Sequence, residues 1–221
     1  MKMMIYRYMQ IRDIVNNIYI KNNINCFPIR IKKIINSFNN IKMIKYSFLI
    51  KNNNLTLEEI KSILGSEDGC TSCDASIDRY IIYYNDIEMG KSRIKWTLAH
   101  ELGHVLLKHH FNSDGSVNKF LPENEYIYKE YEANLFASWI LAHPIILNNL
   151  DIIDASNLTT FCNLSNTAAN IRYSRFCKYE KGLFLIESDY KILSYFKDYI
   201  EDKHEDYLLH QRFINSFRLA Y

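Results

Sequence analysis

The stretch that decides the fold is Thr97-Leu98-Ala99-His100-Glu101-Leu102-Gly103-His104. On a helix, side chains four residues apart lie on one face, with Cβ atoms about 5–6 Å apart. His100 and His104 can therefore bind one metal ion together, at about 2.0–2.1 Å if the ion is zinc. Glu101 is rotated by about 100° from His100, so we expect it to be the catalytic base beside the metal rather than a ligand. Gly103 would let a second element approach this helix closely.

The sequence around this motif predicts a helix that follows a strand. Apolar residues recur at helical spacing from Ser92 to about His109, and the run from Tyr80 to Tyr84 is rich in strand-forming residues. A second long helix is predicted from Pro122 to about His143, where Pro144 interrupts it.

A catalytic zinc ion needs a third protein ligand, and two candidates follow the motif. His110 stands six residues after His104, the spacing of a longer zinc motif that requires glycine at position 107. Leu107 occupies that position. We therefore expect the helix to continue and His109 and His110 to be solvated near its end, where the helix dipole favours them.

The other candidate is Glu132, on the second helix. It shares a helical face with three apolar residues, Phe136, Trp139 and Ile140. An ionised carboxylate on an apolar face is costly unless it is paired or bound to a metal, so we predict Glu132 as the third ligand. The alternative is a salt bridge, for example to Lys129. Two other acids on this helix are fallback ligands, Glu125 and Glu130.

Composition excludes several classes of protein. The chain has 221 residues, of which 48% are hydrophobic, enough to form a packed core. Its net charge of +2 is too small for a protein dedicated to binding nucleic acid or an anionic membrane. Residues 1–13 show no signal peptide. The longest uncharged stretch, Ala133 to Leu150, contains too many polar residues for a membrane span. We expect a cytoplasmic location and no membrane partner.

Several local patterns predict the remaining elements. We expect a strand from Ile41 to Lys51, and a short helix that begins with a capping box, with Thr56 as its N-cap and Glu59 as its partner. A strand is predicted from Leu183 to Ile186. Cys70 and Cys73 have the spacing of a metal-binding or redox pair, but no second pair accompanies them. We interpret them as incidental reduced thiols.

Together, these motifs make the chain resemble a known family. Thr97-Leu98-Ala99 followed by His100 to His104, and then Glu132-Ala133-Asn134-Leu135-Phe136-Ala137, is similar to the ImmA/IrrE family of zinc metallopeptidases. Shorter matches agree in order: Ser66 to Gly69, Tyr83 to Asn85, Asn163 to Ser165, Ala168-Ala169 and Arg172. The resemblance covers about residues 41–179.

The resemblance implies an α+β, zincin-like fold in which a small, mostly antiparallel sheet packs on helices. It also implies a gluzincin-type ligand set, with His100, His104 and Glu132 on zinc and Glu101 as base. We place the metallopeptidase domain at residues 1–182 and a C-terminal extension, mostly helical and of unknown role, at 183–221. Manganese is an alternative metal, because two imidazoles and a carboxylate accept both ions.

The resemblance also implies a substrate. Members of the family are typically cytoplasmic, are often encoded on phages or mobile elements, and cleave a cognate helix-turn-helix repressor in response to stress. We therefore expect a zinc endopeptidase that acts as an anti-repressor, with a small repressor as its protein partner. The oligomeric state and the activating signal are not predicted.

Further site residues are less well defined by the sequence. A second donor to the reaction's oxyanion is expected among Tyr126, Tyr128, Tyr131 and His143. Asn134 is a candidate for orienting a ligand histidine. The substrate is expected to enter extended and to pair with an exposed strand edge near Tyr80 to Tyr84.

One rival interpretation comes from residues 154–179, which have the outline of a helix-turn-helix. Its second helix carries Arg172, Arg175 and Lys178. The alternative function is thus a regulator that binds DNA or a repressor and whose metal site is not catalytic. The modest net charge argues against direct nucleic-acid binding.

Overall fold

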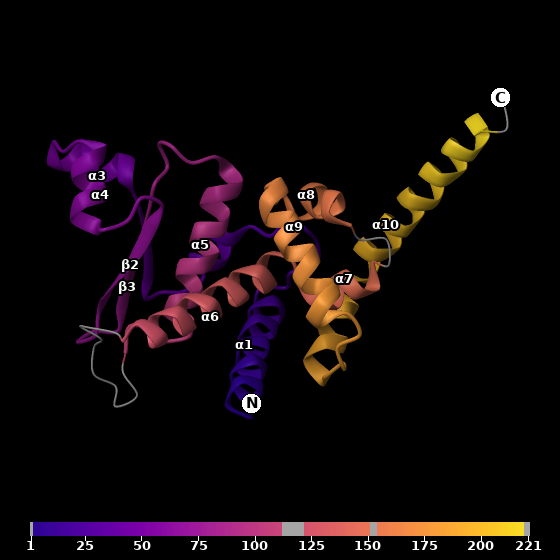
Figure 1. Ribbon diagram of the computed structural model, residues 1–221, viewed down its shortest axis with the longest axis horizontal. Coiled ribbons are helices and arrows are strands. Elements are labelled where there is room, and N and C mark those ends of the chain that lie inside the picture. Colours follow the sequence, from indigo (N-terminus) through magenta and orange to yellow (C-terminus); the bar gives the residue numbers. More distant parts are fainter. Residues whose placement is uncertain (1, 112–121, 151–153, 219–221) are drawn as a thin grey trace. The chain divides into compact units, whose positions relative to one another are not determined.

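A computed structural model describes residues 2–111, 122–150 and 154–218. The chain forms two compact units and passes three times between them. Unit 1 comprises residues 1–15 and 30–141; unit 2 comprises residues 16–29 and 142–221. The α+β class is confirmed, because helices and one small sheet occur together (Figure 1). The predicted domain boundary at residue 182 stays a prediction, since the two units divide the chain at other points.

The sheet belongs to unit 1 and has three strands: β1 (Ile41–Lys45), β2 (Gly69–Asp74) and β3 (Arg79–Tyr84), in the order β1-β3-β2. β2 is antiparallel to β3 and β1 is parallel to it. The expected mostly antiparallel sheet is a mixed sheet, because the antiparallel β2–β3 hairpin returns the chain so that β3 lies beside β1 in the parallel sense.

β3 is the central strand, which corrects the expected substrate edge. Tyr80, Ile82 and Tyr84 are buried on one face, while Ile81 and Tyr83 are half-buried on the other. Both edges of β3 are occupied by partner strands. An extended peptide cannot pair with residues 80–84, and the outer edge of β2 is the alternative.

The connection from β1 to β2 consists of α3 (Tyr46–Asn53) and α4 (Leu57–Leu64). The strand predicted to reach Lys51 ends at Lys45, because a helix begins at the next residue. The Asp86 carboxylate accepts hydrogen bonds from the Ser47 backbone N–H at 3.0 Å and from the Ser47 hydroxyl at 2.7 Å, and thereby stabilises the N-terminus of this helix. The predicted capping box of Thr56 and Glu59 is confirmed, and Gly65 ends α4 with a φ of +64°.

The helical part of unit 1 is built around α5 (Lys91–Leu106) and α6 (Glu123–Leu141). α2 (Ile31–Ile35) and the first half of α1 (Lys2–Lys21) complete it. Its core includes Leu98 and Leu102 from α5 and Phe136 and Trp139 from α6, each with no exposed area. The Tyr8 ring of α1 meets the Trp139 ring edge-on at 4.7 Å.

The two long helices cross at Gly103. A Cβ atom at this position would lie 3.2 Å from the Ala133 Cα atom and 3.0 Å from the Phe136 ring. A side chain at this position would force its neighbours to shift, so glycine on α5 and alanine on α6 allow the two backbones to approach. The expected close approach at Gly103 is confirmed.

Unit 2 is helical: α7 (Pro144–Asn149), α8 (Ala155–Cys162), α9 (Asn166–Arg175), the π-helical turn η1 (Phe176–Glu180) and α10 (Glu187–Arg218). The predicted helix pair is present, with Asp154 and Ser165 as N-caps. The predicted strand at residues 183–186 is wrong, because these residues adopt no regular structure and the Phe184 side chain is 91% exposed.

The basic residues of the helix pair serve unit 2 itself. The Arg172 guanidinium is buried, donates to the Glu180 carboxylate at 2.7 Å and donates twice to the Ala142 carbonyl. Arg175 donates to the other Glu180 oxygen at 3.2 Å. Arg172 is therefore inaccessible to DNA. Within the described ranges, no helix is both long and apolar enough to cross a bilayer.

Replacing Gly103 with valine tests the helix crossing. We expect the free energy of unfolding to fall by about 1–3 kcal/mol, because the added methyl groups meet the α6 backbone and the core cannot yield. Chemical denaturation measures the change. Lys91→Val, at an exposed position on the same helix, is the control, and equal stability of the two variants would contradict the crossing.

Replacing Arg172 with methionine tests its buried ion pair. We expect a loss of about 3–5 kcal/mol, because the Glu180 carboxylate keeps its burial but loses its strongest partner. Lys178→Met, on the exposed surface of η1, should change stability by less than about 0.5 kcal/mol. A small effect of both changes in chemical unfolding would show that Arg172 is not a structural residue.

Candidate metal centre

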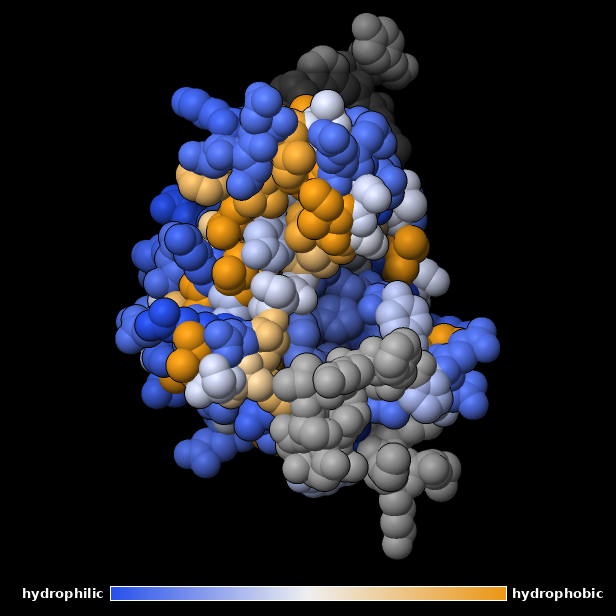
Figure 2. Space-filling view, turned by 90° about the vertical axis from the view of Figure 1, so that its left-hand side faces the viewer, coloured by the Kyte–Doolittle hydropathy of each residue, from blue (hydrophilic) through white to orange (hydrophobic). Residues whose placement is uncertain are grey.

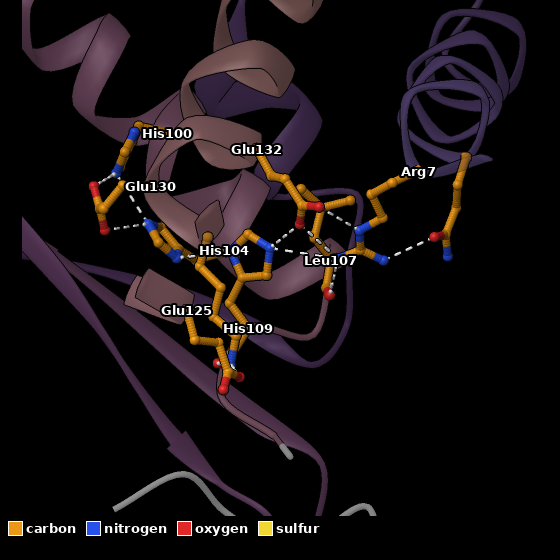
Figure 3. A network of polar contacts seen from close by, with 10 residues as sticks. Arg7, His100, His104, Leu107, His109, Glu125, Glu130 and Glu132 are labelled. Atoms are coloured by element: carbon orange, nitrogen blue, oxygen red, sulfur yellow. Dashed lines mark hydrogen bonds and ion pairs between the residues drawn. The ribbon is translucent and has the colours of Figure 1, made fainter. Parts of the chain in front are cut away.

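Three side chains from two helices converge in unit 1 (Figure 3). His100 and His104 lie one turn apart on α5, with their Nε2 atoms 3.0 Å from each other. Glu130 of α6 places one carboxylate oxygen 3.3 Å from His100 Nε2 and the other 3.2 Å from His104 Nε2. The three groups could hold one metal ion, since their ligand atoms all lie within 4.8 Å of one another.

The spacing of these atoms fits a tetrahedral zinc site. Zinc bonds of about 2.0–2.1 Å at tetrahedral angles place neighbouring ligand atoms about 3.3 Å apart. The two Nε2 atoms are 3.0 Å apart, and each lies 3.2 or 3.3 Å from a different oxygen of the Glu130 carboxylate, distances close to that value. Two imidazole nitrogens and one carboxylate oxygen also form the donor set of a catalytic site with an open fourth position.

Electrostatics keep Glu130 ionised. Hydrogen bonds from His100 and His104 hold the pKa of this carboxyl well below its usual range. Burial by itself would lower the pKa of His100, but Glu130, Glu101 and Asn134 together outweigh burial and raise this pKa. An anionic carboxylate facing two imidazoles is an arrangement that a divalent cation would stabilise.

Glu101 lies beside this cluster and is not part of it. Its carboxylate is buried and accepts a hydrogen bond from the Thr71 hydroxyl of β2 at 2.7 Å. Burial raises the pKa of Glu101 above its ordinary value. A raised pKa makes a carboxylate a stronger base at neutral pH, which suits the role predicted for Glu101.

The structure does not place Glu132 with the two histidines, which corrects the predicted ligand set. Residues two apart on a helix point about 200° away from each other, so Glu130 and Glu132 face opposite sides of α6. Glu132 instead pairs with Arg7 at 2.8 Å and with His109 at 2.9 Å. The salt-bridge interpretation thus describes Glu132, but with Arg7 as partner, because Lys129 pairs with Glu125.

His109 and His110 also differ from the prediction. α5 ends at Leu106, and Lys108 adopts a φ of +56°, which turns the chain back so that the His109 N–H donates to the His104 carbonyl. His109 is buried rather than solvated, and burial lowers its pKa to about 4. His110 lines the cleft, and burial lowers its pKa to about 4 as well.

The remaining predicted site residues separate into two groups. Asn134 lies at the cluster, with its Oδ1 atom 3.0 Å from His100 Nδ1. The described residues that line the cleft do not include Tyr131, whereas Tyr126 is among them. His143 belongs to unit 2, where it is buried, caps α7 and contacts Asn16 at 2.8 Å. Tyr128 is not among the lining residues either, so Tyr126 is the one of the four candidates that lines the cleft in the described residues.

A cleft of about 530 Å³ leads to the cluster. One wall is the segment from Asp68 to Thr71, which enters β2, and another is formed by Trp96 and Thr97 of α5. On the face of unit 1 that carries α3, α4 and β2, Figure 2 shows a hydrophilic hollow with apolar side chains above it. Burial raises the pKa of the Cys70 thiol in this wall to about 11.

The sequence predicted Glu130 only as a fallback ligand and gave no role to Thr71 or Arg7. A signal for Glu130 exists. Gly103 and Ala133 mark the face where the two helices touch, and Glu130 lies one turn before Ala133 on that face. No comparable pattern points to Thr71 or Arg7, since each reaches the site through the tertiary fold.

Residues 60–152 match the family model described as the IrrE N-terminal-like domain, of the Peptidase_M78 family. The ImmA/IrrE resemblance is confirmed. The matched segment contains β2, β3, α5 and α6, and thus the whole candidate metal centre. The ImmA/IrrE family consists of metallopeptidases, so this segment is a domain of a peptidase family. No curated protein matches the chain.

Replacing Glu130 with glutamine tests the third ligand. We expect zinc affinity to fall by more than about 100-fold, beyond the 10–100-fold typical of groups that only support a ligand. A competition titration with a coloured chelator measures it. Glu125→Gln, one turn away and paired with Lys129, is the matched control. Unchanged affinity in Glu130→Gln would exclude Glu130 as a ligand.

Proposed function

We propose that this chain is a zinc-dependent endopeptidase that cleaves a small helix-turn-helix repressor. The observation that carries the proposal is the convergence of His100, His104 and Glu130, with Glu101 beside them. The match of residues 60–152 to a peptidase family supports the hydrolytic activity. The repressor as substrate rests on the family resemblance of the sequence.

A zinc ion at this site would polarise the scissile carbonyl and lower the pKa of water toward about 7. Glu101 accepts the proton from the attacking water and delivers it to the leaving amine. The Thr71 hydroxyl donates to one Glu101 oxygen, which leaves the other oxygen for the proton. Glu130 raises the pKa of Tyr126 in the cleft, so its hydroxyl stays protonated and can donate to the oxyanion.

The substrate would bind as an additional strand. β2 lies at one side of the sheet, where it pairs with β3, and its first half lines the cleft. An extended peptide can pair with such an edge through main-chain hydrogen bonds. Residues 69–71 lie beside the metal cluster, so this pairing would bring a backbone carbonyl of the peptide to the site.

Direct DNA binding is not favoured as a second function. The helix pair that suggested it uses Arg172 and Arg175 to hold Glu180 inside unit 2. The remaining alternative is a protein that binds the repressor through a metal site without cleaving it.

Replacing Glu101 with glutamine separates the peptidase from that alternative. We expect zinc to remain bound at one ion per chain while the cleavage rate falls by about 10²–10⁴-fold, because the general base is lost. The assay incubates the full chain and zinc with the helix-turn-helix repressor encoded beside its gene and follows fragments by mass spectrometry.

Two controls complete this assay. Removing zinc with a chelator should stop cleavage, and adding zinc back should restore it. Glu125→Gln should cleave as the unchanged protein does. Binding of the repressor without cleavage at any zinc concentration would overturn the peptidase proposal and favour the non-catalytic alternative.

A further inference from the structure

A second set of polar groups lies behind the metal cluster and has no part in the reaction described above. His104 Nδ1 is 3.0 Å from His109 Nδ1, and His109 Nε2 is 2.9 Å from Glu132 Oε2. Arg7 donates from Nε to Glu132 Oε1 and from Nη2 to Glu132 Oε2, both at 2.8 Å. The contacts form a continuous chain from a metal ligand to α1, as Figure 3 shows.

The contacts of this chain are consistent with donors and acceptors that alternate from Arg7 to His104. The Glu132 carboxylate, paired with Arg7 through both oxygens, can only accept, so His109 Nε2 must carry a hydrogen. A neutral His109 then accepts at Nδ1, and His104 must donate there. His104 is thereby held through Nδ1, which leaves Nε2, the atom that faces Glu130 and His100, free to turn toward a metal ion.

The backbone supports this arrangement. The turn at Lys108 folds His109 back beneath His104, with the His109 N–H bonded to the His104 carbonyl at 3.0 Å. Arg7 is held in turn by the Gln10 side chain at 2.7 Å and by the Leu107 carbonyl at 3.2 Å. Each member therefore has contacts that fix its direction, which a chance surface contact lacks.

We propose that His109, Glu132 and Arg7 are positioning residues that fix the tautomer and orientation of His104 for the metal. Groups that hold a ligand histidine in this way typically contribute 10–100-fold in metal affinity. The inference rests on the proposed metal centre. It extends that centre to Arg7, which lies outside the segment 60–152 that matches the family.

The test measures zinc affinity rather than peptide cleavage. Competition with a coloured chelator is applied to the full chain and to the variants His109→Leu, His109→Gln and Arg7→Met. We expect His109→Leu and Arg7→Met to bind zinc about 10–100-fold more weakly. His109→Gln keeps one acceptor and one donor, so its affinity should recover to within about threefold of the unchanged chain.

Two further measurements separate positioning from simple loss of structure. The melting temperature of each metal-free variant shows whether it folds, and the visible spectrum of the cobalt-loaded protein reports ligand geometry. Tyr6→Ala, next to Arg7 on α1 and 73% exposed, is the control and should match the unchanged protein. Altered cobalt spectra in His109→Leu and Arg7→Met, with near-normal melting, would support the proposal.

Three outcomes would overturn it. Unchanged zinc affinity in both His109→Leu and Arg7→Met would show that the chain does not position His104. Equal losses in His109→Leu and His109→Gln, matched by equal losses in melting temperature, would show a purely structural role. Absence of zinc binding in the unchanged chain would remove the metal centre itself. Zinc binding without repressor cleavage would instead remove only the proposed function.

Discussion

The close approach of α5 and α6 at Gly103 and Ala133 is the constraint on which the metal centre depends. His100 and His104 share a face because of helix periodicity, but a carboxylate from another helix reaches them only if the two backbones nearly touch. The missing side chain at Gly103 provides that contact, with a prospective Cβ only 3.2 Å from the Ala133 backbone. Glu130 and Asn134 lie on either side of the crossing, and both contact His100.

This geometry explains how much the sequence could predict. The HELGH motif lies within one helix, so its spacing alone determines that two histidines face one point and that the acid between them does not. The capping box at Thr56 and Glu59 is local in the same sense and is present as predicted. The α+β class and the family follow from these local patterns together.

The errors concern contacts between segments far apart in the chain. Glu132 was predicted as a ligand because an acid on an apolar face needs a partner, and it has one, but Arg7 lies 125 residues away and leaves no signal near Glu132. The Asp86 carboxylate stops β1 at Lys45 in the same non-local way. The turn at Lys108 uses a left-handed conformation without glycine, which no residue preference predicts.

The composition of β2 has a consequence for how the protein avoids self-association. An open strand edge is a template on which identical chains can stack. β2 reads Gly-Cys-Thr-Ser-Cys-Asp and contains no Val, Ile, Leu or aromatic residue, so it lacks the side chains that stabilise dry contacts between stacked sheets. A strand of this kind would bind a peptide only while a second interaction also holds the peptide, which favours transient binding over fibril growth.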